Sequence, residues 1–368
     1  MNLLTHVLQP PAYGYEANGQ LLVPSYRQLF KEFFVRQNIF KTRKNWLALF
    51  GWSSSCLFAI PLFIFLSQYF SWPLLFASFV YSMIILGTHG TIWYHRYSTH
   101  RAYTFSHPFW RFIVKNLVIK IIPEETYVVS HHVHHYISEK PGDPYNVFAG
   151  WWYCFLADVI HQPIAKDLSK QDYRRVCHML NHTGIRMNRY AQYQQWGSVC
   201  HPLSTLLHFA LNWAFWYAAF YGLGGHALAT ALFGSAGVWA FGVRTFNYAG
   251  HGSGKDKRQE GIDFNRADLS INQGWPGVIT GEWHNNHHLY PNGARAGFLP
   301  YQFDPAWLFI SACSKIGVVS GYKDYKADFL EKHYLPILRK SALERQPIGI
   351  VDSTKPVVEP TIPLTITP

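Results

Sequence analysis

Fifty consecutive residues without a charged side chain constrain this chain more than any other feature of the sequence. No Asp, Glu, Lys or Arg occurs between Asn45 and Tyr94. A helix needs about 20 apolar residues to cross roughly 30 Å of bilayer hydrocarbon, so the stretch is long enough for two crossings. Ser71, Trp72 and Pro73 mark the turn between them. The stretch therefore predicts a transmembrane hairpin.

A second uncharged block, Tyr190–Val243, predicts a second hairpin. Its apolar part divides at the glycine-rich segment 221–226, which gives helices near 203–221 and 226–246. The composition agrees with a lipid environment, because only 14% of the residues are charged and 17% are aromatic. The mean hydropathy of -0.05 requires a large water-facing part as well. We therefore predict an all-α integral membrane protein with four transmembrane helices in two hairpins and a helical cap outside the bilayer.

The basic residues indicate how the hairpins are oriented. Six Lys or Arg precede residue 46, twelve lie in residues 95–189 and fourteen follow residue 243, which accounts for all 32. Because cytoplasmic segments are enriched in Lys and Arg, we expect both termini and the long middle segment to be cytosolic. The net charge of +11 suits an anionic membrane surface, and we recognise no nucleic-acid-binding module.

Histidines form four short patterns on this predicted cytosolic side. In the run 131–135, His131, His134 and His135 share one helical face, whereas His132 points elsewhere. Neutral imidazole is the commonest protein ligand for transition metals, so this spacing predicts a metal site. The other patterns are HxxxxH at His95 and His100, NxxxH at Asn247 and His251, and HxxHH at His284, His287 and His288. Together the four patterns contain nine candidate ligand histidines. Because one metal usually takes at most six ligands, nine imidazoles argue for two adjacent metals.

Other segments complete the predicted organisation. Arg27–Phe40 fits either an amphipathic helix on the membrane surface or an ordinary packed helix. Phe105–Ile122 and Phe148–Ile160 are apolar but contain charges, so we expect them in the interface or packed on the site rather than across the bilayer. Five scattered cysteines form no CxxC pair and suggest reduced core residues. The Pro-rich tail beyond Leu335 predicts a flexible or extended end.

These four patterns resemble those of the membrane fatty acyl desaturases, the family that includes the stearoyl-CoA desaturases. The likeness covers roughly residues 45–300 and includes the order of the motifs and the hairpins between them. The third box lacks a glycine often found between Glu282 and Trp283, and Ser130 stands where animal members have Asp. The matching segments are 95–101 (first histidine box), 131–146 (second box), 247–251 (NxxxH) and 281–291 (third box).

The resemblance implies a di-iron centre that uses O₂ to insert a cis double bond into a saturated acyl chain, position 9 being common in the family. Removing hydrogen from mid-chain carbons needs an oxidant that a redox-active metal generates from O₂. Zinc is not redox-active and could not generate it. We expect Asp143, Glu282 and Asp268 to orient the imidazoles, although a surface salt bridge or a helix cap is at least as good an interpretation. The implied iron ligands are His95, His100, His131, His134, His135, His251, His284, His287 and His288, with Asn247 reaching one iron through a water.

The resemblance also implies partners. The substrate is a long acyl chain carried as a CoA thioester, a phospholipid or a free acid, and we expect it in a narrow aromatic-lined tunnel opening to the cytosolic face. Electrons come from a separate donor such as a ferredoxin or cytochrome b5 with its reductase, because the sequence has no haem, flavin or ferredoxin motif. Residues 291–297 are more similar to bacterial members of the family. The resemblance therefore implies a location in the bacterial inner membrane, where the two predicted hairpins would make the protein multi-pass.

Two other readings stay open at this point. The same scaffold supports a di-iron fatty acid or alkane hydroxylase, or a decarboxylase that forms terminal alkenes. A metal transporter is a different class, but transporters keep their ligands near the bilayer midplane, and here the histidine patterns lie at span ends and beyond. The predicted single domain, 1–368, is divided into 1–45 (cytosolic), 46–94 (hairpin 1), 95–200 (boxes 1 and 2), 201–246 (hairpin 2), 247–335 (NxxxH and box 3) and 336–368 (flexible tail).

Overall fold

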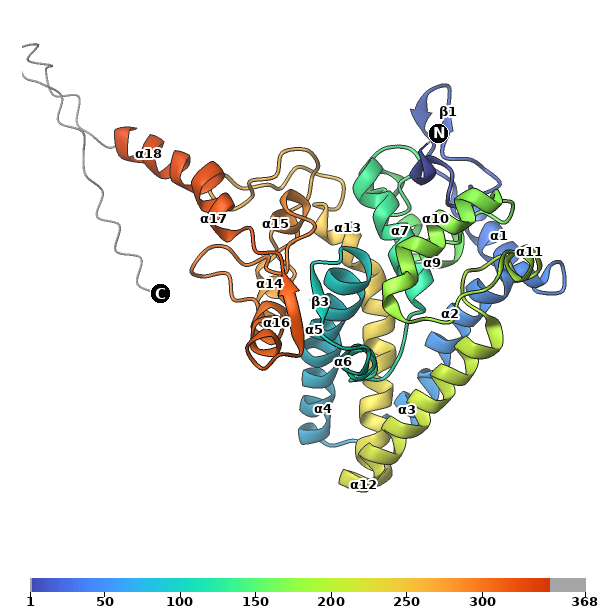
Figure 1. The fold of residues 1–368 in the computed structure, drawn as a ribbon. Helices are drawn as coiled ribbons and strands as arrows, with labels where there is room; N and C mark the ends of the chain where they lie inside the picture. Colours follow the sequence, from blue (N-terminus) through green and yellow to red (C-terminus); the bar gives the residue numbers. More distant parts are fainter. Residues whose placement is uncertain (1, 345–368) are drawn as a thin grey trace, which may run out of the picture. The chain divides into compact units, whose positions relative to one another are not determined.

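The computed structural model describes residues 2–344 of the chain, with side chains through Arg339. The chain divides after Lys326 into two compact units. The first unit is mostly helical, as predicted, and all the histidine patterns lie in it (Figure 1). It also contains two small antiparallel sheets that the sequence did not indicate, β1 (Glu16–Ala17) with β2 (Gln20–Leu21) and β3 (Tyr103–Phe105) with β4 (Val319–Tyr322).

Helices account for most of the remaining structure. Short 3-10 and π-helical turns connect several of them into longer rods. In chain order the α-helices are α1 (Tyr26–Gln37), α2 (Trp46–Leu57), α3 (Ala59–Ile64), α4 (Trp72–Phe79), α5 (Gly87–His89), α6 (Pro108–Lys115), α7 (Glu124–Ile137), α8 (Trp151–Phe155), α9 (Ala157–Ile160), α10 (Lys170–Leu180), α11 (Tyr190–Trp196), α12 (Pro202–Gly242), α13 (Phe246–Gly250), α14 (Gly274–Thr280), α15 (His284–Leu289), α16 (Pro305–Lys315), α17 (Lys326–Phe329) and α18 (Leu335–Glu344).

Three helical segments of the described chain are long and apolar enough to cross a membrane: Arg43–Tyr69, Trp72–Thr99 and Pro202–Gly250. The first two are the predicted first hairpin. The chain turns between them at Ser71, whose hydroxyl accepts a hydrogen bond from Leu74 N (3.4 Å), and Pro73 occupies the first turn of α4. This is a standard helix start, because the Ser side chain replaces a missing helical acceptor and Pro needs no N–H there.

The third segment is broken inside α12. Gly224 (φ -157°) and Gly225 (φ +65°) have non-helical backbone angles, and the second of these is a conformation that glycine adopts without strain. Figure 1 shows two arms that meet near the α12 label and both rise from it, forming a V. The division predicted at residues 221–226 is therefore confirmed and lies at the glycine pair.

Small residues allow the second arm of α12 to pack closely on α3. A Cβ atom at Gly234 would lie 2.6 Å from Leu62 Cα, and one at Gly237 would lie 2.6 Å from Phe58 Cβ. Close backbone approach through small residues is the usual way in which helices associate in a membrane, where burial of apolar surface gives little driving force. This packing fixes the end of α12 that leads into α13.

The segments expected outside the bilayer form short helices. Within residues 2–344, neither 105–122 nor 148–160 belongs to the three candidate spans; they contain α6 and, in the second segment, α8 and α9. The segment 27–40 contains α1, which buries Leu29 and Phe33 and exposes 68% of Phe34. Thus α1 packs on the protein with one face and presents an aromatic residue on the other.

The second unit begins at Ala327 and contains the end of α17, a π-helical turn over Leu330–Tyr334 and α18. Helix α18 occupies part of the segment 336–368 that the sequence predicts to be a flexible tail. The rest of that segment, 345–368, lies outside the described residues.

Candidate metal centre

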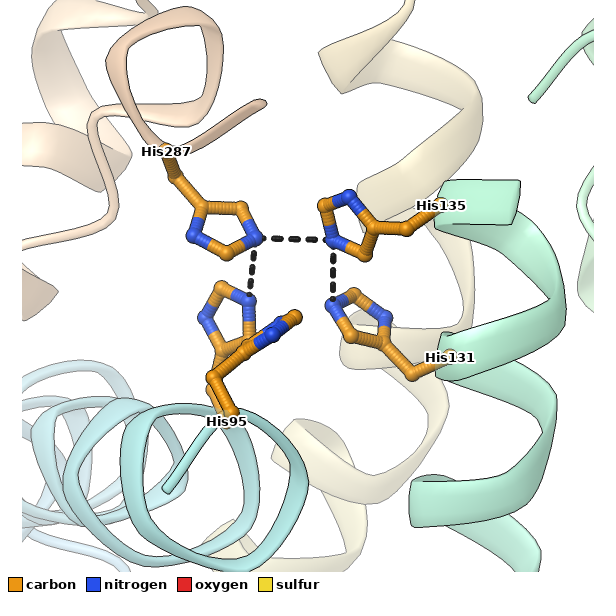
Figure 2. A group of neighbouring side chains, drawn as sticks. His95, His131, His135 and His287 are labelled. Carbon is orange, nitrogen blue, oxygen red and sulfur yellow. Dashed lines mark hydrogen bonds between the residues drawn. The ribbon is translucent and has the colours of Figure 1, made fainter. Parts of the chain in front are cut away.

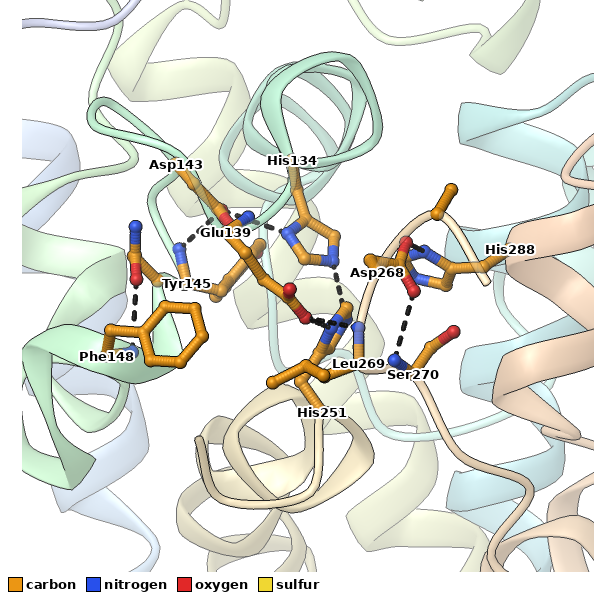
Figure 3. A network of polar contacts seen from close by, with 12 residues as sticks. His134, Glu139, Asp143, Tyr145, Phe148, His251, Asp268, Leu269, Ser270 and His288 are labelled. Carbon is orange, nitrogen blue, oxygen red and sulfur yellow. Dashed lines mark hydrogen bonds and ion pairs between the residues drawn. The ribbon is translucent and has the colours of Figure 1, made fainter. Parts of the chain in front are cut away.

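The structure gathers the nine predicted histidines into two neighbouring groups. The first contains His95, His100, His131, His135 and His287, and the second contains His134, His251, His284 and His288. Within each group, one ring nitrogen from every residue lies within 4.8 Å of the others. Helix α7 contributes to both groups: His131 and His135 belong to the first (Figure 2) and His134 belongs to the second (Figure 3). His132 belongs to neither group.

Several buried contacts hold the histidine-bearing segments together. Arg96 donates hydrogen bonds to Gly281 O (2.5 Å), Ala294 O (2.6 Å) and Asp304 Oδ2 (3.0 Å), which ties the end of the second span to the segments flanking α15. A Cβ at Gly250 would lie 2.8 Å from His284 Cδ2, so glycine permits α13 to approach α15.

The residues between the histidines of the third box are also structural. Asn285 Oδ1 accepts hydrogen bonds from Phe264 N (2.7 Å) and Asn265 N (2.8 Å), and Asn286 Nδ2 donates to Ala296 O (2.7 Å). Both amides are fully buried. Sequence reasoning assigned them no role, although two adjacent Asn residues inside a histidine box are a signal that the helix is anchored on both sides.

The distances between ring nitrogens fit bound metal. His134 Nδ1 lies 2.9 Å from Asp143 Oδ1 and His251 Nδ1 lies 2.7 Å from Glu139 Oε1. A carboxylate accepts, so both Nδ1 atoms donate and both Nε2 atoms carry bare lone pairs, which face each other at 3.2 Å. Two metal–nitrogen bonds of about 2.1 Å at a right angle would place the nitrogens about 3.0 Å apart. A cation between them removes the repulsion of the lone pairs.

The five-histidine group shows the same crowding. His287 Nε2 lies 2.8 Å from His95 Nε2 and 2.9 Å from His135 Nε2, and His135 Nε2 lies 3.1 Å from His131 Nε2 (Figure 2). One proton per ring cannot satisfy all of these contacts at once. In addition, His100 Nε2, His284 Nε2 and His288 Nε2 are buried without a hydrogen-bond partner. Buried polar atoms rarely stay unpaired, so the donor set fits metal ions.

Burial keeps these imidazoles in the form that binds metal. It lowers the pKa of His131, His135 and His287 well below the ordinary value, and the neighbouring imidazoles lower it further. Burial alone would also lower the pKa of His134, but the Asp143 carboxylate raises it above the ordinary value. Neutral rings present a lone pair to a metal at neutral pH.

Carboxylates hydrogen-bond to the Nδ1 atoms of four of the rings. Each of the three carboxylates expected to orient an imidazole contacts one: Glu282 contacts His95 (2.7 Å), Asp143 contacts His134 (2.9 Å) and Asp268 contacts His288 (2.7 Å). The fourth, Glu139 with His251, was missed (Figure 3). Its position in the same short loop as Asp143 was the available signal, but which histidine it meets depends on the tertiary fold.

Three histidines outside the four patterns make other contacts. His89 Nε2 lies 2.8 Å from Val114 O, His208 Nε2 lies 2.8 Å from Asn116 Oδ1, and His226 Nδ1 lies 2.9 Å from Tyr217 Oη. None of them belongs to a histidine group.

A large cavity adjoins both groups. It has a volume of about 570 Å³, and its wall includes His95 and His131 of one group and His284 of the other. Asn247, the predicted water-holding residue, also lines it. Most of the remaining wall is apolar or aromatic, including Leu47, Met83, Ile122, Tyr127, Val238, Trp239, Phe246 and Ile279. A pocket of this size and character suits an apolar ligand.

Comparison with known proteins decides the family. The family model described as "Fatty acid desaturase" matches residues 69–307, a range that contains every residue of the two histidine groups. The chain belongs to the fatty acid desaturase family. Its enzyme class is therefore that of the oxidoreductases.

Relatives of this desaturase-family chain extend over most of its length. It is 25% identical over 325 residues to an sn-1 stearoyl-lipid 9-desaturase of Synechocystis, covering 83% of this chain and 92% of that protein. It is 28% identical to the sn-1 stearoyl-lipid 9-desaturase of Anabaena variabilis, covering 71% and 88%. An acyl-CoA C20 Delta5-desaturase of Anemone leveillei is 26% identical, covering 77% and 86%. The relatives thus include proteins named for two different acyl carriers.

Proposed function

We propose that this protein is an O₂-dependent fatty acyl desaturase that inserts a cis double bond, at position 9, into a saturated acyl chain. The observation that carries the proposal is the placement of nine buried imidazoles in two groups against one apolar cavity. The position of the double bond follows the names of the two cyanobacterial relatives. The reaction balances as –CH₂–CH₂– + O₂ + 2 e⁻ + 2 H⁺ → –CH=CH– + 2 H₂O.

The two histidine groups would each hold one iron. The five-histidine group offers His95, His100, His131, His135 and His287, and the four-histidine group offers His134, His251, His284 and His288. Asn247, which lines the adjoining cavity, would reach one iron through a water. Two irons, when bound, supply the redox chemistry with O₂ that breaking unactivated C–H bonds demands. Imidazole suits iron, although its affinity alone does not select iron over zinc or copper.

The protein's own residues bind and orient the substrate. Apolar walls of the cavity remove the acyl chain from water, at about 0.8 kcal/mol for each buried methylene. Because His95, His131 and His284 form part of the same wall, a chain in the cavity passes both histidine groups. Tyr127, which stacks on the ring of His131 with a centroid distance of 5.3 Å, limits where the reacting carbons can lie.

The membrane arrangement follows from the three candidate spans. We propose four crossings, because the break at Gly224 and Gly225 divides the third span into two arms that each match a predicted helix. The distribution of Lys and Arg supports a topology with both termini and the histidine groups on the cytosolic face. We propose the bacterial inner membrane as the location, because residues 291–297 resemble bacterial members of the family. Electrons would come from a ferredoxin or from cytochrome b5 with its reductase, attracted by the basic cytosolic segments.

Fatty-acid profiling tests the proposal. The full chain is expressed in a desaturase-deficient host with its donor system, beside the variants His134→Ala and His226→Ala. Wild type and His226→Ala should produce monounsaturated chains, because His226 contacts only residues remote from the histidine groups, whereas His134→Ala should produce none. Identical profiles for wild type and His134→Ala would refute the proposal. Hydroxylated acids or terminal alkenes would assign the hydroxylase or decarboxylase chemistry instead.

Metal analysis separates the enzyme from a transporter. The purified protein should retain two irons per chain after extensive dialysis, since both groups are buried. Rapidly exchanging zinc in place of iron would contradict the proposed enzyme.

A further inference from the structure

Three carboxylates accept hydrogen bonds from rings of the four-histidine group, and only one accepts from a ring of the five-histidine group. We infer that Glu139, Asp143 and Asp268 make the four-histidine group the more electron-rich metal site, so that it binds its iron more tightly and is oxidised first. The inference rests on the two-iron centre proposed above and adds to it an order between the two sites.

In the four-histidine group, three of the four rings donate Nδ1–H to a carboxylate. Asp143 accepts from His134 (2.9 Å), Glu139 accepts from His251 (2.7 Å) and Asp268 accepts from His288 (2.7 Å) (Figure 3). The fourth ring, His284, has its Nδ1 3.9 Å from Glu282 Oε1, which is beyond hydrogen-bond distance. These carboxylates are largely buried, so water screens their charge weakly.

In the five-histidine group, only His95 has such a partner, Glu282 at 2.7 Å. Among the residues that the structure describes, no carboxylate oxygen lies within ion-pair distance of His100, His131, His135 or His287. The Nδ1 atom of His131 is buried without any hydrogen-bond partner. The asymmetry is therefore three hydrogen-bonded carboxylates at the four-histidine group against one at the five-histidine group.

The chemical consequence concerns the opposite nitrogen of each ring. A carboxylate that accepts Nδ1–H fixes the tautomer and increases the basicity of Nε2, which strengthens its bond to a metal. Added negative charge near a metal also stabilises its higher oxidation state. Both effects favour ferric iron at the four-histidine group.

Glu139 is held in place to make this contact. Its φ of +63° is unusual for a residue other than glycine. That backbone position is held by a hydrogen bond from Glu139 N to Asp143 Oδ2 (2.8 Å). Its carboxylate then accepts from both His251 Nδ1 and Leu269 N, each at 2.7 Å. Glu139 is thus a positioning residue that joins the loop after α7 to the loop carrying Asp268.

The test uses the full chain in detergent, loaded with ⁵⁷Fe and examined by Mössbauer spectroscopy. Wild type should give two doublets of equal area, and half-stoichiometric oxidant should convert one of them first. Glu139→Gln and Asp268→Asn keep the shape of the side chain and remove its charge. They should alter the parameters of the doublet that oxidises first, whereas the control Glu282→Gln should alter chiefly the other.

Chelator competition provides a second readout that does not depend on turnover. One iron should leave before the other, and Glu139→Gln should weaken retention of the later one by about 10–100-fold. Simultaneous oxidation of both doublets, or an effect of Glu139→Gln confined to the iron lost first, would overturn the inference. A protein that binds two irons and desaturates but shows equal sites refutes only this inference, whereas absence of iron or of unsaturated product refutes the proposed function.

Discussion

Two adjacent glutamates in the first turn of α7 should respond to pH in opposite ways. Glu125 is 1% exposed; its Oε2 accepts a hydrogen bond from Cys200 N (2.7 Å), and its Oε1 has no partner. Burial raises the pKa of Glu125 from 4.5 to about 7. Glu124 instead accepts from Lys120 Nζ (2.5 Å) and lies 3.5 Å from Lys115 Nζ.

The direction in which pH changes the stability contributed by Glu125 follows from proton linkage. Its pKa in the folded state exceeds the unfolded value, so the native protein binds more protons between pH 4.5 and about 7, and stability falls as pH rises through that window. The shift of about 2.5 pH units corresponds to at most about 3 kcal/mol. Glu125→Gln removes the free-energy cost of burying a charged carboxylate at high pH, and the Gln side-chain oxygen can still accept the hydrogen bond from Cys200 N. The variant should therefore be more stable than wild type by up to that amount at pH 8.5, and equally stable at pH 4.5.

The stability contributed by Glu124 changes with pH in the opposite direction. Burial alone would raise the pKa of Glu124, but the ammonium groups of Lys115 and Lys120 lower it below the ordinary value. Its stabilising effect is present above pH 4.5 and is lost as pH falls. Glu124→Gln leaves two buried ammonium groups without a counter-charge, which should cost about 3–5 kcal/mol at neutral pH.

SDS-induced unfolding in mixed micelles, followed by tryptophan fluorescence, gives the free energy of unfolding of wild type and both variants between pH 4.5 and 8.5. Each variant is the control of the other, because they change the same residue type in the same helical turn. If Glu125→Gln destabilises the protein equally at every pH, or if both variants shift stability in the same direction at pH 8.5, the assignment of the two charge states is refuted.

Three further predictions concern the fold and the centre. Asp304→Asn should lower the free energy of unfolding by about 3–5 kcal/mol, because Asp304 is the only carboxylate paired with the buried Arg96 among the described residues; an unchanged SDS midpoint would contradict this. Gly225→Ala should cost about 1–2 kcal/mol through its φ of +65°, with Gly222→Ala, inside a regular helix, as a control that should not destabilise. Removing metal with a chelator should lower the thermal midpoint, because the lone pairs of His134 and His251 then face each other without a cation, and Fe²⁺ should restore it; a midpoint indifferent to metal would argue against the centre.

The sequence alone indicated where the candidate spans lie and which nine histidines gather, because both depend on local properties of the chain. The length of an uncharged stretch such as 45–94 can be counted directly and compared with the thickness of a bilayer. The i, i+3, i+4 spacing of His131, His134 and His135 is likewise a property of a single helix. The glycine-rich break in α12 was visible for the same reason, since a turn inside an apolar helix needs residues free to adopt left-handed backbone angles.

Only the tertiary structure decided how these parts combine. Neighbouring residues of one helix, His134 and His135, enter different groups because the partners that face them come from α13, α15 and the second span. Glu139 could not be assigned to His251 from the sequence, since 112 residues separate them and the contact depends on a left-handed backbone held by Asp143. The same holds for the cavity, whose wall combines spans, α7 and α14. Periodicity is a property of consecutive residues, whereas the division of the nine histidines between two groups is fixed by packing across the fold.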